Sequence, residues 1–365
     1  MKRRPVHSSD TTGLPIRPKD AGRGGRARCI FLAAGGLILA NGCASPKPEW
    51  TLSRADGPVW PAPPEQPRIQ YLNELRGTEG FGNRAGAPAG WRRLLFGPDS
   101  PISLVTPHAV AVHPTRSIVA VADTNGGAVL VFDLDRHKVE RVPCRAADDA
   151  PIGCPVGVAW KGEALYIADS KPPRVIVKEA AGQRRVLGEG QLIRPAGLAA
   201  CTEQDRIYVA DAGSHSVFAF DSAGTLLFRT GARGVGTGEF NFPSQIACAP
   251  DGSLVVADSL NFRVQQLRAD GSPIAAFGQK GDAAGDFALP KGVAVDPDGN
   301  IWVVDAHFEN IQAFTPGGQL LLAFGGEGAG PGQFWLPAGI HIDPRRRLWI
   351  ADTYNRRVQV FQILQ

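Results

Sequence analysis

From residue 104 to residue 365, short apolar runs alternate with polar and glycine-rich turns at a regular interval. In each interval one apolar run ends in Ala or Val followed by Asp, and these aspartates are 46, 42, 47, 47 and 47 residues apart. A proline opens the apolar run before it, with spacings of 48, 40, 48, 47 and 47 residues. The markers are Pro107, Asp123, Pro155, Asp169, Pro195, Asp211, Pro243, Asp258, Pro290, Asp305, Pro337 and Asp352. Two independent markers that keep one period six times indicate six structural repeats.

Residues 290–325 show what one repeat contains. Short runs rich in β-branched and aromatic residues are separated by Asp-Pro-Asp-Gly and Pro-Gly-Gly, which are typical of tight turns. No stretch after residue 100 has a long apolar period of 3.6 residues, so helices are at most incidental. A small sheet of four strands cannot bury both faces alone, whereas six sheets arranged radially cover one another. The sequence therefore predicts an all-β, six-bladed β-propeller.

The repeats resemble those of the NHL family. That family has an apolar strand ending in Ala-Asp, then a short loop, then Asn-Arg-Val and an aromatic residue. Residues 351–361, Ala-Asp-Thr-Tyr-Asn-Arg-Arg-Val-Gln-Val-Phe, match this signature best, residues 257–264 follow, and the other repeats match more loosely. The resemblance covers residues 104–365 and implies a propeller whose channel opens as a binding site on the face that carries the aspartates. The preceding Pro-rich segment resembles the opening of extracytoplasmic bacterial members of this group.

The sixth repeat ends after its third strand, at residues 361–365, so its fourth strand must come from elsewhere. Residues 68–75, Arg-Ile-Gln-Tyr-Leu-Asn-Glu-Leu, resemble the fourth strands at 320–324 and 274–277. We therefore expect residues 68–75 to complete blade six and to join the two ends of the chain. An insertion over residues 78–103 follows, in which Trp91-Arg-Arg-Leu-Leu-Phe96 is predicted to form a short amphipathic turn that caps one face.

Residues 1–42 have the parts of a secretory signal in order: a basic stretch, an apolar run over 29–40, and small residues. The apolar run is shorter than the roughly twenty residues that span a bilayer as a helix. Residues 39–43, Leu-Ala-Asn-Gly-Cys, resemble a bacterial lipoprotein cleavage box, with Ala40 where such boxes usually have Leu. The resemblance implies that Cys43 carries lipid and anchors the protein in the bacterial cell envelope, facing the periplasm or the exterior. Ordinary cleavage with release and an uncleaved cytoplasmic product are the alternatives.

The Pro-rich residues 43–67 are predicted to be a tether, because such sequence favours extended polyproline II. Its apolar residues Trp50, Val59 and Trp60 indicate that part of it lies on the domain.

Charge argues against nucleic acid as a partner. The formal charge of +4 comes from the leader, because residues 43–365 hold 31 basic and 33 acidic side chains. A protein that neutralises several phosphates needs a concentrated basic surface.

The six aspartates would form a ring on one face. We expect each carboxylate to accept hydrogen bonds from backbone N–H groups of its own loop, since the loop repeats with the blade. A cation site in the channel is the alternative. Arginines that recur with the repeat are expected to pair with nearby loops or carboxylates, namely Arg174, Arg263 and Arg357.

One histidine breaks a series of alanines that should face the channel. The series is Ala111, Ala159, Ala199, Ala247, Ala294 and His341. His108 and His307, in the two flanking blades, should lie on the same face. Three histidines from adjacent blades could hold zinc with an open position, although separately satisfied histidines are the simpler interpretation.

Aromatic and basic residues complete the candidate ligand face. Phe240, Phe287 and Phe334 recur in Gly-x-Phe-x-x-Pro and are expected to pack between blades. Trp335, beside Phe334, has no counterpart in the other repeats and is expected to be exposed. The candidate ligand-face residues are His108, Lys291, His307, Trp335 and His341.

Two enzyme groups have related propellers. The peptide-amidating lyases use a metal on three histidines with Tyr and Arg, which implies Tyr354 and Arg357 as candidate catalytic residues here, without a local motif specific to those enzymes. Lactonase-like propellers use a calcium ion on acidic and Asn side chains, and no matching set can be placed. No Gly-x-Ser-x-Gly, Walker-type loop, CxxC pair or His-Glu-x-x-His occurs. No cofactor is therefore expected, with zinc or calcium as the alternatives.

Four cysteines remain after Cys29 and Cys43. In an oxidising compartment, Cys144 and Cys154 are predicted to form a disulfide across a loop of about ten residues. Cys248 lies on an inner strand where other repeats have apolar residues, so it is interpreted as a buried small hydrophobe. Cys201 lies at a turn and has no assigned role.

Taken together, these features predict a lipid-anchored, extracytoplasmic scaffold that binds a protein, peptide or glycan on one propeller face without catalysis. The alternative is a metal-dependent lyase or hydrolase that acts in the channel through His108, His307 and His341.

Overall fold

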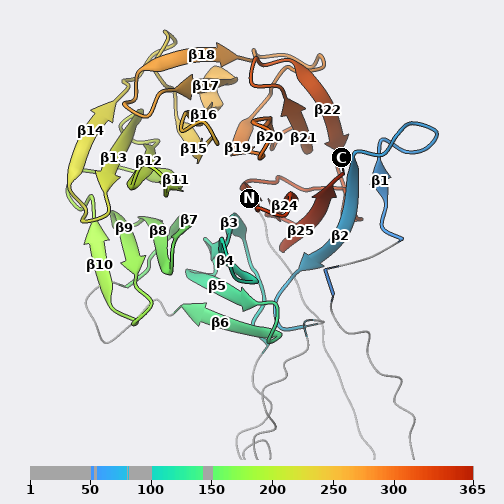
Figure 1. Cartoon of the computed structure of the whole chain (residues 1–365), viewed down its shortest axis with the longest axis horizontal. Coiled ribbons are helices and arrows are strands. Elements are labelled where there is room, and N and C mark those ends of the chain that lie inside the picture. The colour runs from blue at the N-terminus through green and yellow to red at the C-terminus, as the bar shows by residue number, and fades with distance from the viewer. Residues whose placement is uncertain (1–50, 53–55, 80, 82–100, 143–150, 365) are drawn as a thin grey trace, which may run out of the picture. The chain divides into compact units, whose positions relative to one another are not determined.

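Six β-sheets surround a central axis as the blades of a propeller (Figure 1). The computed structural model describes residues 51–52, 56–79, 81, 101–142 and 151–364. Within these residues the only helical element is a single 3₁₀ turn, η1 (Ser259–Asn261). The predicted all-β, six-bladed fold is therefore confirmed.

Blades one to five each have four antiparallel strands in sequence order from the axis outward. Blade one has β3 (Pro107–Val112), β4 (Ile118–Asp123), β5 (Ala128–Asp133) and β6 (Lys138–Val142), and blade two has β7 (Pro155–Lys161), β8 (Ala164–Ser170), β9 (Pro173–Lys178) and β10 (Arg184–Leu187). Blade three has β11 (Pro195–Cys201), β12 (Arg206–Asp211), β13 (Ser216–Asp221) and β14 (Leu226–Thr230), and blade four has β15 (Pro243–Cys248), β16 (Leu254–Asp258), β17 (Arg263–Leu267) and β18 (Pro273–Phe277). Blade five has β19 (Pro290–Val295), β20 (Ile301–Asp305), β21 (Asn310–Phe314) and β22 (Leu320–Gly325).

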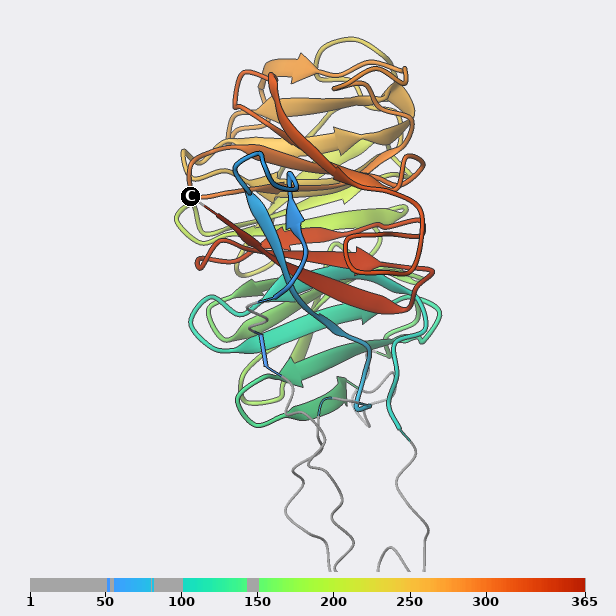
Figure 2. The ribbon, with the colours of Figure 1, turned by 90° about the vertical axis from the view of Figure 1, so that its right-hand side faces the viewer.

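Blade six joins the two ends of the described chain. Its strands β23 (Ile340–Ile342), β24 (Arg347–Asp352) and β25 (Arg357–Ile363) come from the C-terminal end, and β2 (Ile69–Leu75) pairs antiparallel with β25. The register runs from Ile69 opposite Ile363 to Leu75 opposite Val358. Figure 2 shows the blue β2 lying along the dark-red β25. The prediction that residues 68–75 complete this blade is confirmed.

A fifth strand covers the outer edge of blade six. Strand β1 (Val59–Trp60) pairs with β2, and the ring of Trp60 lies 5.6 Å from Phe324 and 5.8 Å from Phe361. The later part of the Pro-rich segment thus belongs to the domain, as its apolar residues indicated.

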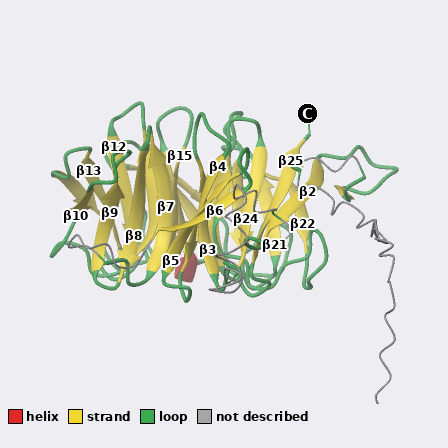
Figure 3. Ribbon diagram, turned by 90° about the horizontal axis from the view of Figure 1, so that it is seen from below, coloured by secondary structure: helices red, strands yellow, loops and turns green. Residues whose placement is uncertain are grey.

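The two faces of the ring differ in chemistry. Each inner strand begins at a marker proline, and each second strand returns to end at a marker aspartate, as in the pairing of Pro107 with Asp123. We call the face at this end the Asp face and the opposite one the turn face. In Figure 3 the red η1, which follows Asp258, marks the Asp face at the bottom of the ring.

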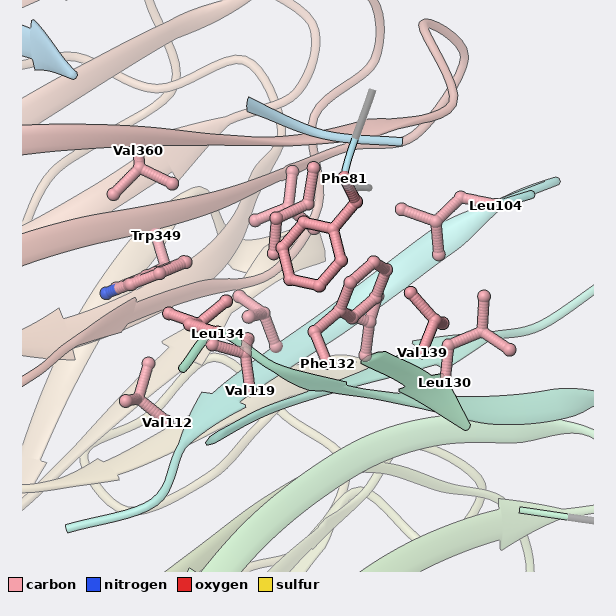
Figure 4. Packing of buried hydrophobic residues seen from close by; sticks show 14 of the residues in the cluster. Phe81, Leu104, Val112, Val119, Leu130, Phe132, Leu134, Val139, Trp349 and Val360 are labelled. Carbon is pink, nitrogen blue, oxygen red and sulfur yellow. The ribbon is translucent and has the colours of Figure 1, made fainter. Parts of the chain in front are cut away.

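The core lies between the blades. Strand side chains alternate, so each blade presents one apolar face to each neighbour. Between blades six and one, Trp349 and Val360 meet Val119 and Phe132, and Phe81 from the segment after β2 packs edge-on against Phe132 (Figure 4). The aromatic residues expected between blades are fully buried there, namely Phe240, Phe287 and Phe334.

A disulfide joins blades three and four. It links Cys201, at the end of β11, to Cys248, at the end of β15, with the two Cα atoms 5.9 Å apart. The interpretation of Cys248 as a small hydrophobe was wrong, because two inner strands converge at the turn face and bring both thiols within bonding range.

Several predicted features lie outside the described residues. They are the signal over 1–42, the lipidated Cys43, Trp50, the turn at 91–96 and Cys144, so the pairing of Cys144 with Cys154 stays a prediction.

Candidate ligand-binding face and channel

The marker aspartates hold the loops of the Asp face in place. All six carboxylates are buried, with at most 2% of each residue exposed. Asp305 accepts from the backbone N–H groups of Ala288 at 2.7 Å, Leu289 at 3.1 Å, His307 at 3.0 Å and Phe308 at 3.1 Å. The prediction that the carboxylate caps its own loop is confirmed in four blades, by Asp123, Asp169, Asp211 and Asp305. It is wrong for Asp258 and Asp352, where side-chain N–H groups of the loop and of the next strand take the place of the backbone donors. In all six blades the carboxylate also accepts from the backbone just before the inner strand.

The guanidinium of the candidate catalytic residue Arg357 is held by hydrogen bonds within the protein. Its guanidinium donates to Asp352 at 2.7 Å, to Glu74 at 2.8 Å, and to the carbonyls of Gly330 and Gln333 at 2.8 and 2.9 Å. Only 1% of the residue is exposed. A catalytic role is therefore a wrong interpretation, since no donor faces solvent, and the expectation of structural pairing is confirmed.

Arg263 repeats this arrangement in blade four. It donates to Asp258 at 2.8 Å and to three carbonyls of the preceding loop. In blade two, Arg174 donates to the carbonyl of Pro151 and lies 4.0 Å from Asp169. The recurring arginines thus brace the loops of the Asp face.

Trp335 and Tyr354 form an exposed aromatic pair on the Asp face. Their ring centroids are 5.5 Å apart, and Trp335 is 50% and Tyr354 54% exposed. The backbone fixes the pair, because Asp352 accepts from the N–H of Trp335 and the N–H of Tyr354 donates to the carbonyl of Trp335. The prediction that Trp335 is exposed is confirmed, whereas Tyr354 acts as its partner at the surface.

Other blades place exposed aliphatic residues at equivalent positions. Trp335 stands two residues before its marker proline, and Tyr354 two residues after its marker aspartate. We define the apolar rim as the exposed large apolar residues at these two positions, which are Val105, Ile193, Leu260, Trp335 and Tyr354. The other exposed residues at these positions are Asn125, Gly153, Lys171 and His307, so the rim is interrupted by polar residues. The rim as a whole was not predicted from the sequence. A signal for it was present, because large apolar residues recur at fixed distances from the marker prolines and aspartates, inside loops that are otherwise polar.

His108 and Lys291 lie near the axis at the Asp face. Both follow a marker proline, and the equivalent residue of the blade between them is the small Ala338. Burial and the nearby positive charge of Lys291 lower the pKa of His108 to about 4, although the hydrogen bond between Nδ1 and the carbonyl of Val156, at 2.8 Å, opposes this shift. Burial also lowers the pKa of Lys291. Within the described residues no carboxylate forms an ion pair with Lys291.

The three candidate metal ligands are not brought together. His307 is exposed and lines a surface hollow of about 420 Å³ with Phe262 and Lys280. His108 is held by Val156, and His341 lies midway along the channel. Among the described residues no group of three His, Cys, Asp or Glu side chains is arranged to hold a metal ion. The alternative in which the three histidines converge on one metal ion is therefore not supported, because they occupy different depths along the axis.

The channel contains a cavity of about 280 Å³. The predicted series of five alanines and His341 lines it, which confirms their placement. The lining extends to Pro114, Thr202 and Pro344, which follow the inner strands, so the cavity opens toward the turn face. Burial lowers the pKa of His341 to about 4, although Asp343 opposes this shift, and the imidazole is neutral at physiological pH.

Three segments of the chain match the NHL repeat, at residues 192–220, 287–312 and 334–361. They coincide with strands of blades three, five and six. The chain thus contains NHL repeats in three of its blades, and its described residues form a six-bladed β-propeller.

Solved structures of the same fold have varied roles. A gluconolactonase from Xanthomonas campestris is 18% identical with a TM-score of 0.56, and the match covers 85% of this chain and 99% of that one. An auxiliary nutrient binding protein from Bacteroides thetaiotaomicron is 15% identical with a TM-score of 0.56, covering 71% and 69% of the two chains. A catalytically inactive virginiamycin B lyase from Staphylococcus aureus with quinupristin is 12% identical with a TM-score of 0.52, covering 71% and 95%. At these identities the similarity establishes the fold alone.

No curated protein matches the chain. Among the described residues, no helix has the length and apolar character that crossing a bilayer requires.

Proposed function

We propose that this protein is a non-catalytic binding scaffold of the bacterial cell envelope, which recognises a protein or peptide through the apolar rim of its Asp face. The observation that carries the proposal is the exposed Trp335–Tyr354 pair, fixed by Asp352 and accompanied by aliphatic residues at the same register positions. Large aromatic residues held in one conformation are favoured in binding sites, because little side-chain entropy is lost on contact.

The aliphatic part of the rim favours a protein or peptide over a glycan. Val105, Ile193 and Leu260 offer apolar surface without hydrogen-bonding groups. A sugar would use the aromatic pair but would leave its hydroxyl groups unpaired against the aliphatic side chains.

Two features support a position outside the cytoplasm. The first is the signal-like leader with its cleavage box at Cys43. The second is the disulfide between Cys201 and Cys248, since such bonds persist mainly in oxidising compartments. Two or three acyl chains on Cys43 would give stable membrane anchoring.

The rim is tested by cross-linked capture from envelope extracts. Wild type is compared with a double variant, Trp335→Ala with Tyr354→Ala, and with Ile274→Ala, which removes an exposed apolar side chain from β18. We expect wild type and Ile274→Ala to enrich the same protein and the double variant to lose it at least tenfold. Equal enrichment by all three proteins would overturn the proposal, and so would a glycan as the species that depends on the rim.

The anchor is tested by expressing the full chain with a labelled fatty acid. We expect label in the wild type, no label in Cys43→Ser, and loss of the variant from the membrane fraction. A wild-type protein that stays unlabelled and soluble in the cytoplasm would contradict the envelope location while leaving the rim untouched.

A further inference from the structure

The channel cavity has a composition that sets it apart from the Asp face. Its lining includes the alanines of five blades together with Val, Ile and Leu residues of the inner strands. None of the lining residues is Asp, Glu, Lys or Arg. A cavity with such walls favours an uncharged occupant, since a charge moved into it would lose its hydration without gaining a partner.

Several polar groups that line this cavity lack partners within the described residues, among them the buried indole N–H of Trp160. His341 and Gln245 are half-buried and line the cavity from blades six and four, with blade five between them. In the described part of the chain neither side chain forms a hydrogen bond within the protein. Because a half-buried polar group gains stability from a partner, both groups are available to a molecule in the channel.

His341 is the one departure from a repeated small residue. Alanine at the other five positions keeps the channel wide, and an imidazole at the sixth supplies a hydrogen-bonding group where the other blades have a methyl group. The burial that keeps this imidazole neutral lets it donate and accept one hydrogen bond each. Trp160 adds an aromatic wall at the turn-face end.

The size of the cavity limits the ligand. An apolar cavity of about 150 Å³ holds benzene, and sites for drug-sized molecules begin at about 300 Å³. A cavity of about 280 Å³ suits one or two small rings.

We propose that the channel is a binding site, entered from the turn face, for a small, uncharged, largely apolar molecule whose single polar group hydrogen-bonds to His341. The site is separate from the apolar rim and does not depend on the proposed function. The disulfide between Cys201 and Cys248 ties two inner strands together beside the entrance, since Cys248 and Thr202 both line the cavity.

Three probes of matched shape test the site in solution. Indole carries one N–H group, indene has the same ring system without it, and indole-3-carboxylate adds a charge. Binding to the purified domain is measured by ligand-observed NMR at increasing ligand concentration. We expect wild type to bind indole saturably, indene more weakly, and indole-3-carboxylate not at all.

Two kinds of variant test separately the hydrogen bond to His341 and the free space in the channel. His341→Ala extends the alanine series of the other blades and should weaken indole about fivefold while leaving indene unchanged, because one neutral hydrogen bond is lost. Ala247→Leu, or Ala159→Leu if the first variant does not fold, fills the channel and should abolish binding of both probes. Trp335→Ala, on the Asp face, should change neither.

Two results would overturn the proposal. One is the absence of saturable indole binding by wild type up to its solubility limit, which would mean that the channel holds only water. The other is indole binding that a folded channel-filling variant leaves unchanged, which would place the probe elsewhere.

Discussion

Arg357 on the last strand donates a hydrogen bond at 2.8 Å to Glu74 on β2, across 283 residues of chain. The same guanidinium holds Asp352, so one side chain links the closing strand to the Asp-face loops. Burial raises the pKa of Glu74, but Arg76 and Arg357 outweigh it and leave the pKa below its usual value. The pair therefore stabilises the closed ring at neutral pH, and its contribution is lost as the pH falls through that lowered pKa.

Arg357→Met should destabilise the domain by about 3 to 5 kcal/mol, because Asp352 and Glu74 lose their shared cation and Asp352 is fully buried. Urea unfolding measures the effect. Arg263→Met is the matched control, since it removes the same contact to an aspartate in blade four but none to a closing strand. If the ring is closed by this pair, Arg357→Met costs more than Arg263→Met; equal losses would show that Glu74 contributes nothing.

Deleting residues 68–75 should lower the melting temperature sharply. The deletion removes the outer partner of β25 and takes Ile69, Tyr71 and Leu75 out of the core. Differential scanning calorimetry measures the change. An unchanged melting temperature would refute closure by this strand.

Acid should weaken the fold before the carboxylates titrate. His108 and His341 have pKa values of about 4 in the folded protein, against about 6.5 when unfolded. Between these values the unfolded chain binds protons that the folded one does not, so stability falls as the pH drops from about 6.5 to about 4. Above about pH 6.5 both histidines are neutral in the folded and in the unfolded protein, so they do not make the stability depend on pH.

His341→Ala isolates this contribution. Its stability relative to wild type should be greater at pH 4.5 than at pH 7, with a more positive difference in the free energy of unfolding, because the variant has no imidazole to protonate on unfolding. Chemical denaturation at the two pH values gives the difference, and subtraction cancels the carboxylates common to both proteins. The same difference at both pH values would show that the imidazole is solvated like an exposed one.

The repeat markers predicted more of the observed structure than the isolated candidate site residues did. Pro107 and Asp123 fall opposite each other in the observed register, because turn residues and a period of about 47 residues are local signals. Closure by residues 68–75 was predictable for a related reason, since an incomplete blade leaves an unpaired strand.

The sequence could not predict how far along the channel axis each residue lies or which residues of neighbouring blades come into contact. His108, His307 and His341 belong to neighbouring blades, yet their distances along the axis depend on strand length and twist, which no local motif records. The pairing of Cys201 with Cys248 depends on the convergence of two inner strands at the turn face. Arg357 had a sequence signal in its recurrence, and that signal indicated structure and not catalysis.

Replacing Cys201 and Cys248 together with alanine should cost about 4 kcal/mol in the chain-entropy model, since the bond closes a loop of 47 residues. Thermal melts with and without dithiothreitol measure the effect. We expect the reductant to lower the melting temperature of wild type and to leave the double variant unchanged. A wild-type melt that ignores the reductant after full reduction, verified by thiol titration, would contradict the prediction.

Asp305→Asn distinguishes a loop cap from a cation ligand. Both carboxylate oxygens of Asp305 accept backbone N–H groups, so an amide NH₂ at either position would face a donor and leave it unpaired. We expect a loss of about 1 to 3 kcal/mol for the buried donor, with faster hydrogen exchange at Ala288 and Phe308.

Calcium supplies the matching control for Asp305. If the carboxylate serves only these N–H groups, millimolar calcium chloride shifts the melting temperature of wild type and of Asp305→Asn by the same small amount as an equal ionic strength of sodium chloride. A calcium-specific rise in wild type that Asp305→Asn abolishes would instead assign the ring of aspartates to a cation. The loop cap would then be a secondary role of a metal ligand.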